Sequence, residues 1–113
     1  MIHTDGCSTP RESDRWRETL VGVCCNPNVY AIVLVGVGCE TDDAKEIGRR
    51  IEKESKKPVF AAVVQQDGGG AKVIEAAVKA GQQFMADAEK CTREEAPINK
   101  LILATECGGS DAF

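Results

Sequence analysis

The sequence has few aromatic residues, a single histidine and no long apolar run, and each shortage excludes a class of protein. One Trp, one Tyr and three Phe in 113 residues allow only a modest core. No apolar run approaches the roughly 20 residues of a membrane-spanning helix. The first residues also lack the basic and apolar regions of a secretion signal. We therefore expect a cytoplasmic protein without a membrane partner. Because the only histidine is His3, a complete Ser-His-Asp arrangement is absent too.

Basic residues are also fewer than acidic ones. The chain has 14 basic and 18 acidic residues, a net charge of −4, and its basic residues are scattered. A nucleic acid partner would require a clustered basic face, so we expect none. The composition, 42% apolar and 28% charged, is that of a globular protein and excludes disorder and coiled coils. Its length is that of one domain, residues 1–113.

The six cysteines contain no Cys-x-x-Cys spacing, so a zinc ribbon or a thioredoxin-type site is not indicated. Two of them, Cys24 and Cys25, are adjacent, and the chain lacks a secretion signal. A disulfide framework is therefore disfavoured, and we expect reduced thiols.

Three continuous apolar runs predict strands that are buried on both faces, as in a parallel sheet covered by helices. They are residues 29–35, 59–64 and 101–105, and Met1-Ile2 resembles the end of a fourth strand. Segments with helical spacing separate them. The expected buried positions are Trp16, Leu20, Val23 and Cys24 in the first helix, Ala44, Ile47 and Ile51 in the second, and Ile74, Ala77, Val78, Gly81, Phe84, Met85 and Ala88 in the third.

This alternation predicts an α/β fold: three α/β/α layers around a parallel sheet of about four strands, with Rossmann-like crossovers. Met1-Ile2 resembles a strand end, and the chain stops within the polar stretch after residue 105. We therefore expect the chain to be a fragment of a larger enzyme.

The loops that follow the expected strands contain most of the reactive side chains. Parallel strands deliver these loops to one end of the sheet, where ligands bind. The loops are residues 3–7, 36–41, 65–70 and 105–111, and they hold three of the six cysteines and the histidine. Thiolates, imidazoles and carboxylates together bind Fe(II), Mn(II) or Zn(II). Two simpler interpretations stay open: buried structural cysteines, and a plain glycine turn at residues 68–70 in place of an anion site.

Two nucleotide-binding motifs are excluded by their spacing. The dinucleotide fingerprint would need a third glycine where Thr41 stands, so NAD binding is disfavoured. A phosphate loop needs Gly-Lys-Ser/Thr, which the sequence around Lys72 does not supply.

Three motifs resemble the altronate dehydratase and galactarate dehydratase family, which includes a sulfolactate sulfo-lyase subunit. The blocks are Asn26-Pro27-Asn28 leading to Gly38-Cys39-Glu40, the final Gly-Gly-Ser-Asp-Ala-Phe of residues 108–113, and His-x-x-Gly-Cys at residues 3–7. The resemblance implies a segment of the catalytic region of a sugar-acid hydro-lyase. Such enzymes remove water from an aldonate or aldarate to give a 2-keto-3-deoxy acid. They depend on a divalent metal, with Fe(II) favoured and Mn(II) as the alternative.

On this view, residue types suggest roles. The metal ligand candidates are Cys39, Cys107, His3 and Cys7; the catalytic candidates are Glu40, Glu106 and Asp111; the substrate-binding candidates are Gly108, Gly109 and Ser110. The implied partners are a small sugar-acid substrate and the remainder of the parent enzyme, with a homo-oligomer left open. We expect the isolated chain to be inactive because its site is incomplete. The competing hypotheses are a structural or assembly domain and a flavodoxin-like anion binder.

Overall fold

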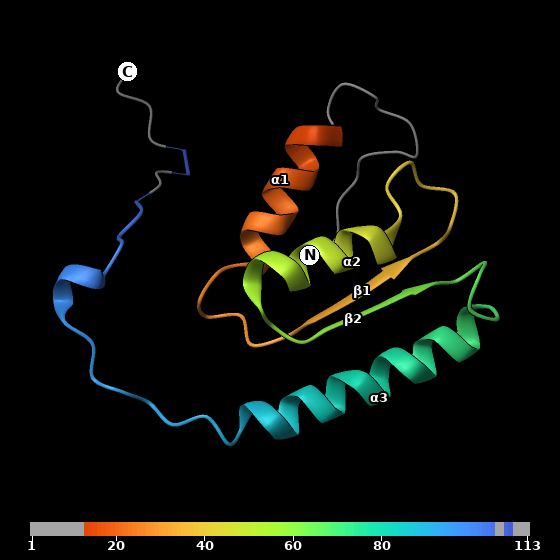
Figure 1. The fold of residues 1–113 in the computed structure, drawn as a ribbon. Coiled ribbons are helices and arrows are strands. Elements are labelled where there is room, and N and C mark those ends of the chain that lie inside the picture. Colours follow the sequence, from red (N-terminus) through yellow and green to blue (C-terminus); the bar gives the residue numbers. More distant parts are fainter. Residues whose placement is uncertain (1–12, 106–107, 110–113) are drawn as a thin grey trace.

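The computed structural model describes residues 13–105 and 108–109, and it has helices on both sides of a small sheet (Figure 1). In chain order the elements are α1 (Ser13–Cys24), β1 (Ile32–Gly36), α2 (Ala44–Ser55), β2 (Val59–Val63), α3 (Gly70–Ala88) and a short 3-10 helix, η1 (Ile98–Lys100). None of the helices in the described ranges is long and apolar enough to cross a membrane.

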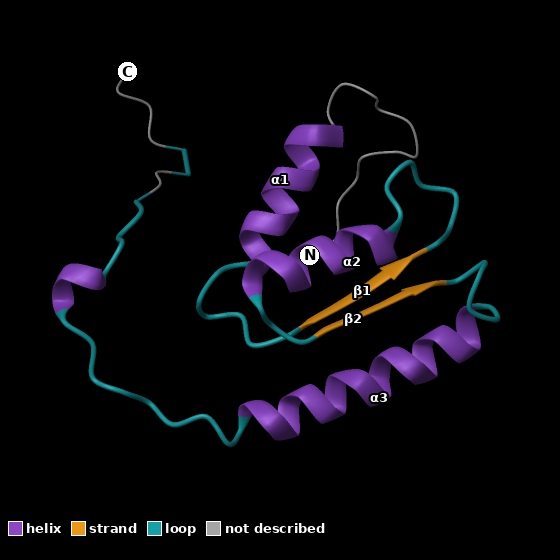
Figure 2. Ribbon diagram, in the orientation of Figure 1, coloured by secondary structure: helices purple, strands orange, loops and turns teal. Residues whose placement is uncertain are grey.

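The sheet consists of β1 and β2, which pair in parallel from Ile32 opposite Val59 to Gly36 opposite Val63. The helix α2 lies on one face of this sheet and α3 on the other (Figure 2). The expected α/β class is therefore confirmed. The wider sheet of about four strands is not formed within the described residues, and the fourth strand, expected at Met1-Ile2, lies outside them.

Residues 101–105, predicted as a strand, are not paired with β1 or β2 in this structure. This segment is extended, and Leu101, Ile102 and Leu103 are 70%, 92% and 79% exposed. It lies apart from β1 and β2 (Figure 1). Apolar sequence alone does not make a strand, because the backbone groups also need a neighbouring strand with which to pair.

The helix α2 has clear end signals. The Asp43 carboxylate caps its start by accepting hydrogen bonds from the amides of Lys45 at 2.7 Å and Glu46 at 3.1 Å. At its end, Lys56 has the left-handed conformation (φ 59°), and its amide donates to the Glu52 carbonyl at 2.9 Å. These bonds satisfy backbone groups that a helix end otherwise leaves unpaired.

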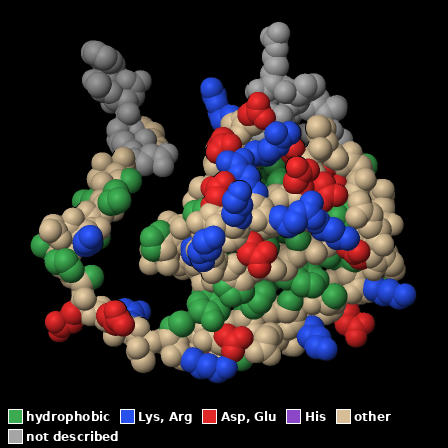
Figure 3. Space-filling model, in the orientation of Figure 1, with side chains coloured by type: hydrophobic (Ala, Val, Ile, Leu, Met, Phe, Trp, Pro, Cys, Tyr) green, Lys and Arg blue, Asp and Glu red, His purple; other side chains and the backbone are tan. Residues whose placement is uncertain are grey.

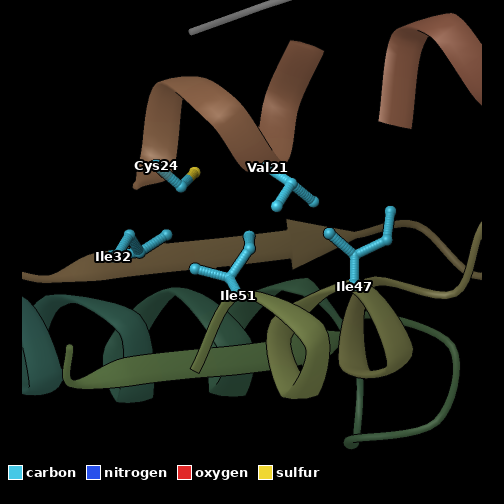
Figure 4. Close-up of a cluster of buried hydrophobic side chains, with 5 residues drawn as sticks. All are labelled: Val21, Cys24, Ile32, Ile47 and Ile51. Carbon is cyan, nitrogen blue, oxygen red and sulfur yellow. The ribbon is translucent and has the colours of Figure 1, made fainter. Parts of the chain in front are cut away.

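The main core cluster joins α1, β1 and α2 (Figure 4). It consists of Val21, Cys24, Ile32, Ile47 and Ile51. Ile47 and Ile51 confirm the predicted face of α2. In α1 the prediction of Val23 was wrong: it is 44% exposed, whereas Val21 is 2% exposed. The face of α1 that meets α2 is centred between Leu20 and Cys24, and Val23 lies outside it.

The helix α3 buries less of its apolar face than its sequence predicts. Val73 is buried, whereas Ile74, Val78 and Met85 are 65%, 53% and 67% exposed. Figure 3 shows apolar side chains at the surface between the sheet and α3. A sheet of two strands is too narrow to cover the whole apolar face of this helix, which explains the difference.

Candidate functional site

The loop after β1 contains the two predicted site residues that the structure places near the sheet. Cys39 is exposed and forms no disulfide with another described cysteine, and Glu40 is half-buried. The two predicted glycines of residues 108–109 are exposed, and this short segment lies apart from the loop after β1 (Figure 1). The structure therefore does not bring these glycines together with Cys39 and Glu40.

Six other predicted site residues lie outside the described residues. They are His3, Cys7, Glu106, Cys107, Ser110 and Asp111.

Glu40 folds back on its own loop. The amide of Gly38 donates to Oε2 at 2.6 Å, and the amide of Val37 donates to Oε1. Desolvation acts to raise the pKa of Glu40, but hydrogen bonds from backbone amides, led by Val37 and Gly38, outweigh it and hold the pKa below its ordinary value. The carboxylate is therefore ionised at neutral pH and engaged in holding the turn that presents Cys39.

Two glycines let this loop pass close to its neighbours. A Cβ on Gly36 would lie 3.0 Å from the Cβ of Ala44 in α2. Gly38 has φ +112°, and a Cβ there would lie 3.0 Å from both the Val63 Cγ1 and the Gln65 Cβ. Only glycine adopts this conformation at little cost. The loop is thus held against the end of β2, where the amide of Gln65 donates to the Val37 carbonyl at 3.1 Å.

An ion pair that the sequence did not predict lies at the same end of the sheet. Lys45 Nζ lies 2.7 Å from Asp67 Oδ1, and the amide of Val63 donates to Asp67 Oδ2 at 2.7 Å. These bonds, from Lys45 first and then Val63, lower the pKa of Asp67. Lys45 is in the first turn of α2 and Asp67 follows β2, so both positions were visible in the sequence as residues at the carboxyl end of the strands.

The donors needed for a metal site are not assembled within the described part of the chain. There, no three His, Cys, Asp or Glu side chains form a group that could hold an ion. Cys39 presents a thiol, but the Glu40 carboxylate is turned toward backbone amides. The described residues alone therefore do not fit a metal, and the other three candidate ligands, His3, Cys7 and Cys107, lie outside them.

The cysteines away from this loop differ in their surroundings. Cys24 is buried in the core, and burial, together with neighbouring Cys25, raises the pKa of its thiol, so it stays protonated. Cys91 is exposed, because it follows the end of α3.

A hollow of about 520 Å³ lies at the opposite end of the sheet, where β2 begins. Its lining is Arg49, Glu52, Lys53, Lys56, Lys57 and Pro58. It is separate from the loops that carry Cys39 and Asp67.

The chain is similar to known proteins along most of its length. Residues 1–89 match the family model described as D-galactarate dehydratase/altronate hydrolase, second domain. The chain is 32% identical to the (2R)-sulfolactate sulfo-lyase subunit beta of Chromohalobacter salexigens, over 82% of this chain and 23% of the relative. It is 25% identical to the altronate dehydratase of Bacillus subtilis, over 100% of this chain and 22% of the relative.

A further relative is the galactarate dehydratase (L-threo-forming) of Escherichia coli, which is 24% identical over 84% of this chain and 19% of the relative. No solved structure matches the chain significantly. The chain spans about a fifth of the length of these curated relatives. Because the family model covers residues 1–89, well over half of the sequence, the chain belongs to the D-galactarate dehydratase/altronate hydrolase family and corresponds to its second domain.

Proposed function

We propose that the chain is a segment of a metal-dependent sugar-acid hydro-lyase that removes water from an aldonate or aldarate and releases a 2-keto-3-deoxy acid. The observation that carries the proposal is the match of residues 1–89 to the dehydratase family model. Relatives named altronate dehydratase and galactarate dehydratase support it. Cys39, exposed on a loop at the carboxyl end of the parallel strands, supports it as well, because ligands bind at that end of such sheets.

Elimination of water next to a carboxylate needs a base for the α proton and assistance for the departing hydroxide. Glu40 suits neither role, because its ionised carboxylate already accepts hydrogen bonds from the backbone amides of its own loop. We assign Glu40 to positioning Cys39, and the proton transfers to Glu106 and Asp111. The backbone of Gly108 and Gly109, together with Ser110, would bind the substrate carboxylate.

The proposed metal is Fe(II), with Mn(II) as the alternative, and when bound it would supply Lewis-acid stabilisation of negative charge. Its ligands would be Cys39 and Cys107 with His3 or Cys7. Cys39 is the described member of this set, and it is exposed on the loop that follows β1.

The competing function is a structural domain of such an enzyme, which is favoured by the lack of a three-donor cluster within the described ranges. A sulfo-lyase reaction is the other alternative, since a sulfo-lyase subunit is 32% identical.

The test is Cys39→Ser in the natural-length protein that contains this chain, with Cys91→Ser as the control. Both cysteines are exposed, but Cys91 follows the end of α3, away from the proposed site. We expect Cys39→Ser to lose the bound metal and to have a turnover rate at least tenfold lower, while Cys91→Ser keeps both its metal and its turnover rate. Unchanged metal content and turnover in Cys39→Ser would support the structural interpretation instead.

A further inference from the structure

We propose that the free edge of β1 is a docking site for this chain's own apolar segment, residues 101–105, which pairs there as a third parallel strand. Two observations support this proposal. The outer side of β1 has no partner strand within the described residues, and residues 101–105 form an apolar, strand-like segment that remains exposed.

The side chains of β1 indicate that a neighbour is missing. Val33 and Val35 are 39% and 53% exposed, although β1 is apolar along its length. On the same face, Ala62 of β2, which is opposite Val35 in the register, is only 4% exposed. On this face, therefore, Val33 and Val35 of β1 are open to solvent, whereas Ala62 of β2 is covered.

Within the described residues, β1 also has no partner strand on that side. The amide of Ile32 donates to the Pro58 carbonyl at 3.0 Å, and the Gly36 carbonyl accepts from Val64 at 2.9 Å, so these residues bond toward β2. Because backbone groups alternate along a strand, those of Val33 and Val35 point to the free edge.

The arrangement of the helices identifies the edge at which the next strand belongs. The crossover from β1 to β2 passes through α2 on one face, and α3 lies on the opposite face (Figure 2). Connections between parallel strands are right-handed in nearly all sheets. Two right-handed crossovers whose helices lie on opposite faces of a sheet move the chain in opposite directions across that sheet. The first crossover leads from β1 to β2, so the second leads from β2 back past β1. The strand after α3 therefore lies on the far side of β1. The resulting order is residues 101–105, then β1, then β2.

The connection is long enough for this position. The helix α3 returns the chain to the end of the sheet where the strands begin, and residues 89–100 then link it to residue 101. Twelve residues can span about 40 Å when extended. The required crossing of two strand positions is about 10 Å.

Leu101, Ile102 and Leu103 supply the apolar cover that β1 lacks. A second copy of the chain could supply the same segment by exchange, because residues 98–105 extend away from the sheet (Figure 1). Within one chain, however, the short linker gives the segment a high effective concentration at β1, which favours intrachain pairing.

Amide hydrogen exchange measured by NMR on the full chain tests this pairing. We expect the amides of Val33 and Val35 to exchange at least tenfold more slowly in the unchanged chain than in Leu103→Pro, which cannot form a continuous ladder. The amides of Ile32 and Val64, which bond between β1 and β2, should stay protected in both and report that the fold is intact. Glu95→Pro, in the linker, is the matched control and should leave Val33 and Val35 protected.

Equal exchange of Val33 and Val35 in the unchanged chain and in Leu103→Pro would overturn the proposal. If Leu103→Pro does not fold, the unchanged chain decides by itself: backbone nuclear Overhauser effects between residues 33–35 and 101–105 support the pairing, and their absence contradicts it. Protection that appears only in a dimer, identified by light scattering, would show exchange between copies and would also overturn it.

Discussion

Substitution of Gly48 by Ala tests the contact that places α2, and with it the loop of Cys39, on the sheet. A Cβ at Gly48 would lie 2.9 Å from the Cβ of Ala61 and 3.4 Å from the Cγ1 of Val59. Carbon atoms pack best at about 3.5–4.0 Å, so α2 must move by roughly 0.6 Å or more. Ala61 is in a paired strand and cannot move independently of the sheet.

Two opposing effects determine the size of the change. Overpacking of a well-packed contact costs about 1–3 kcal/mol. Replacing glycine by alanine inside a helix contributes about 1 kcal/mol in the other direction. We therefore expect Gly48→Ala to be destabilised by up to about 2 kcal/mol, and a change of 1 kcal/mol corresponds to about 4–8 °C in Tm for a domain of this size.

The matched control is Gly81→Ala in α3, where a new Cβ would meet no described atom within 4 Å. It receives the helix contribution without the clash, so we expect it to be stabilised by about 0.5–1 kcal/mol. Urea unfolding followed by far-UV circular dichroism measures both variants. The double variant Gly48→Ala, Ala61→Gly should recover part of the loss, because it reopens the space. If Gly48→Ala is as stable as Gly81→Ala, the close packing of α2 on β2 is refuted.

Three further predictions concern the loop and the cap that support the candidate site. Glu40→Ala removes the acceptor of two loop amides and should lower the free energy of unfolding, measured in urea, by about 1–2 kcal/mol. Glu40→Gln should lose less than half as much. Equal stability of the unchanged chain and both variants would contradict the hydrogen bonds to these amides. Asp43→Ala should lower the Tm, and Asp43→Asn should restore most of it, because asparagine also caps helices; a Tm unaffected by Asp43→Ala would contradict the cap. The pKa values of Glu40 and Asp67 are lower in the folded chain than their ordinary values of 4.5 and 3.8. The two carboxylates therefore contribute their full stabilisation of the fold above pH 5, and this stabilisation is lost as the pH falls through the folded pKa values. Unfolding midpoints between pH 2 and pH 7 should show this loss, and it should be smaller in Glu40→Gln; identical pH profiles would contradict it.

The parts of the fold that could be predicted from the sequence are those with local signals. Continuous apolar runs indicated β1 and β2, and the stripe of Ile47 and Ile51 indicated the buried face of α2. These patterns are local because strand and helix periodicities are visible within ten residues.

The remaining differences arise from tertiary context. The apolar run at residues 101–105 reads as a strand, but a strand also requires a paired neighbour. The apolar stripe of α3 predicted burial of Ile74 and Met85, yet burial depends on how wide the sheet beneath it is. Neither condition is written in the local sequence.

The candidate site divides in the same way. Topology correctly placed Cys39 in a loop at the carboxyl end of the strands. The amide bonding of Glu40 depends on the positive φ of Gly38, which the sequence permits but does not specify. The pair of Lys45 and Asp67 depends on the separation of two loops, which is set by the packing of α2 on the sheet.

The most direct test of the proposed function is an assay of the natural-length protein, loaded with Fe(II) under anaerobic conditions, against a panel of aldonates and aldarates with sulfolactate alongside. The proposal predicts that at least one sugar acid yields a 2-keto-3-deoxy acid, measured by chromatography of the product. If no sugar acid loses water while sulfolactate is cleaved, or if neither class of substrate reacts, the proposal of a sugar-acid hydro-lyase is contradicted.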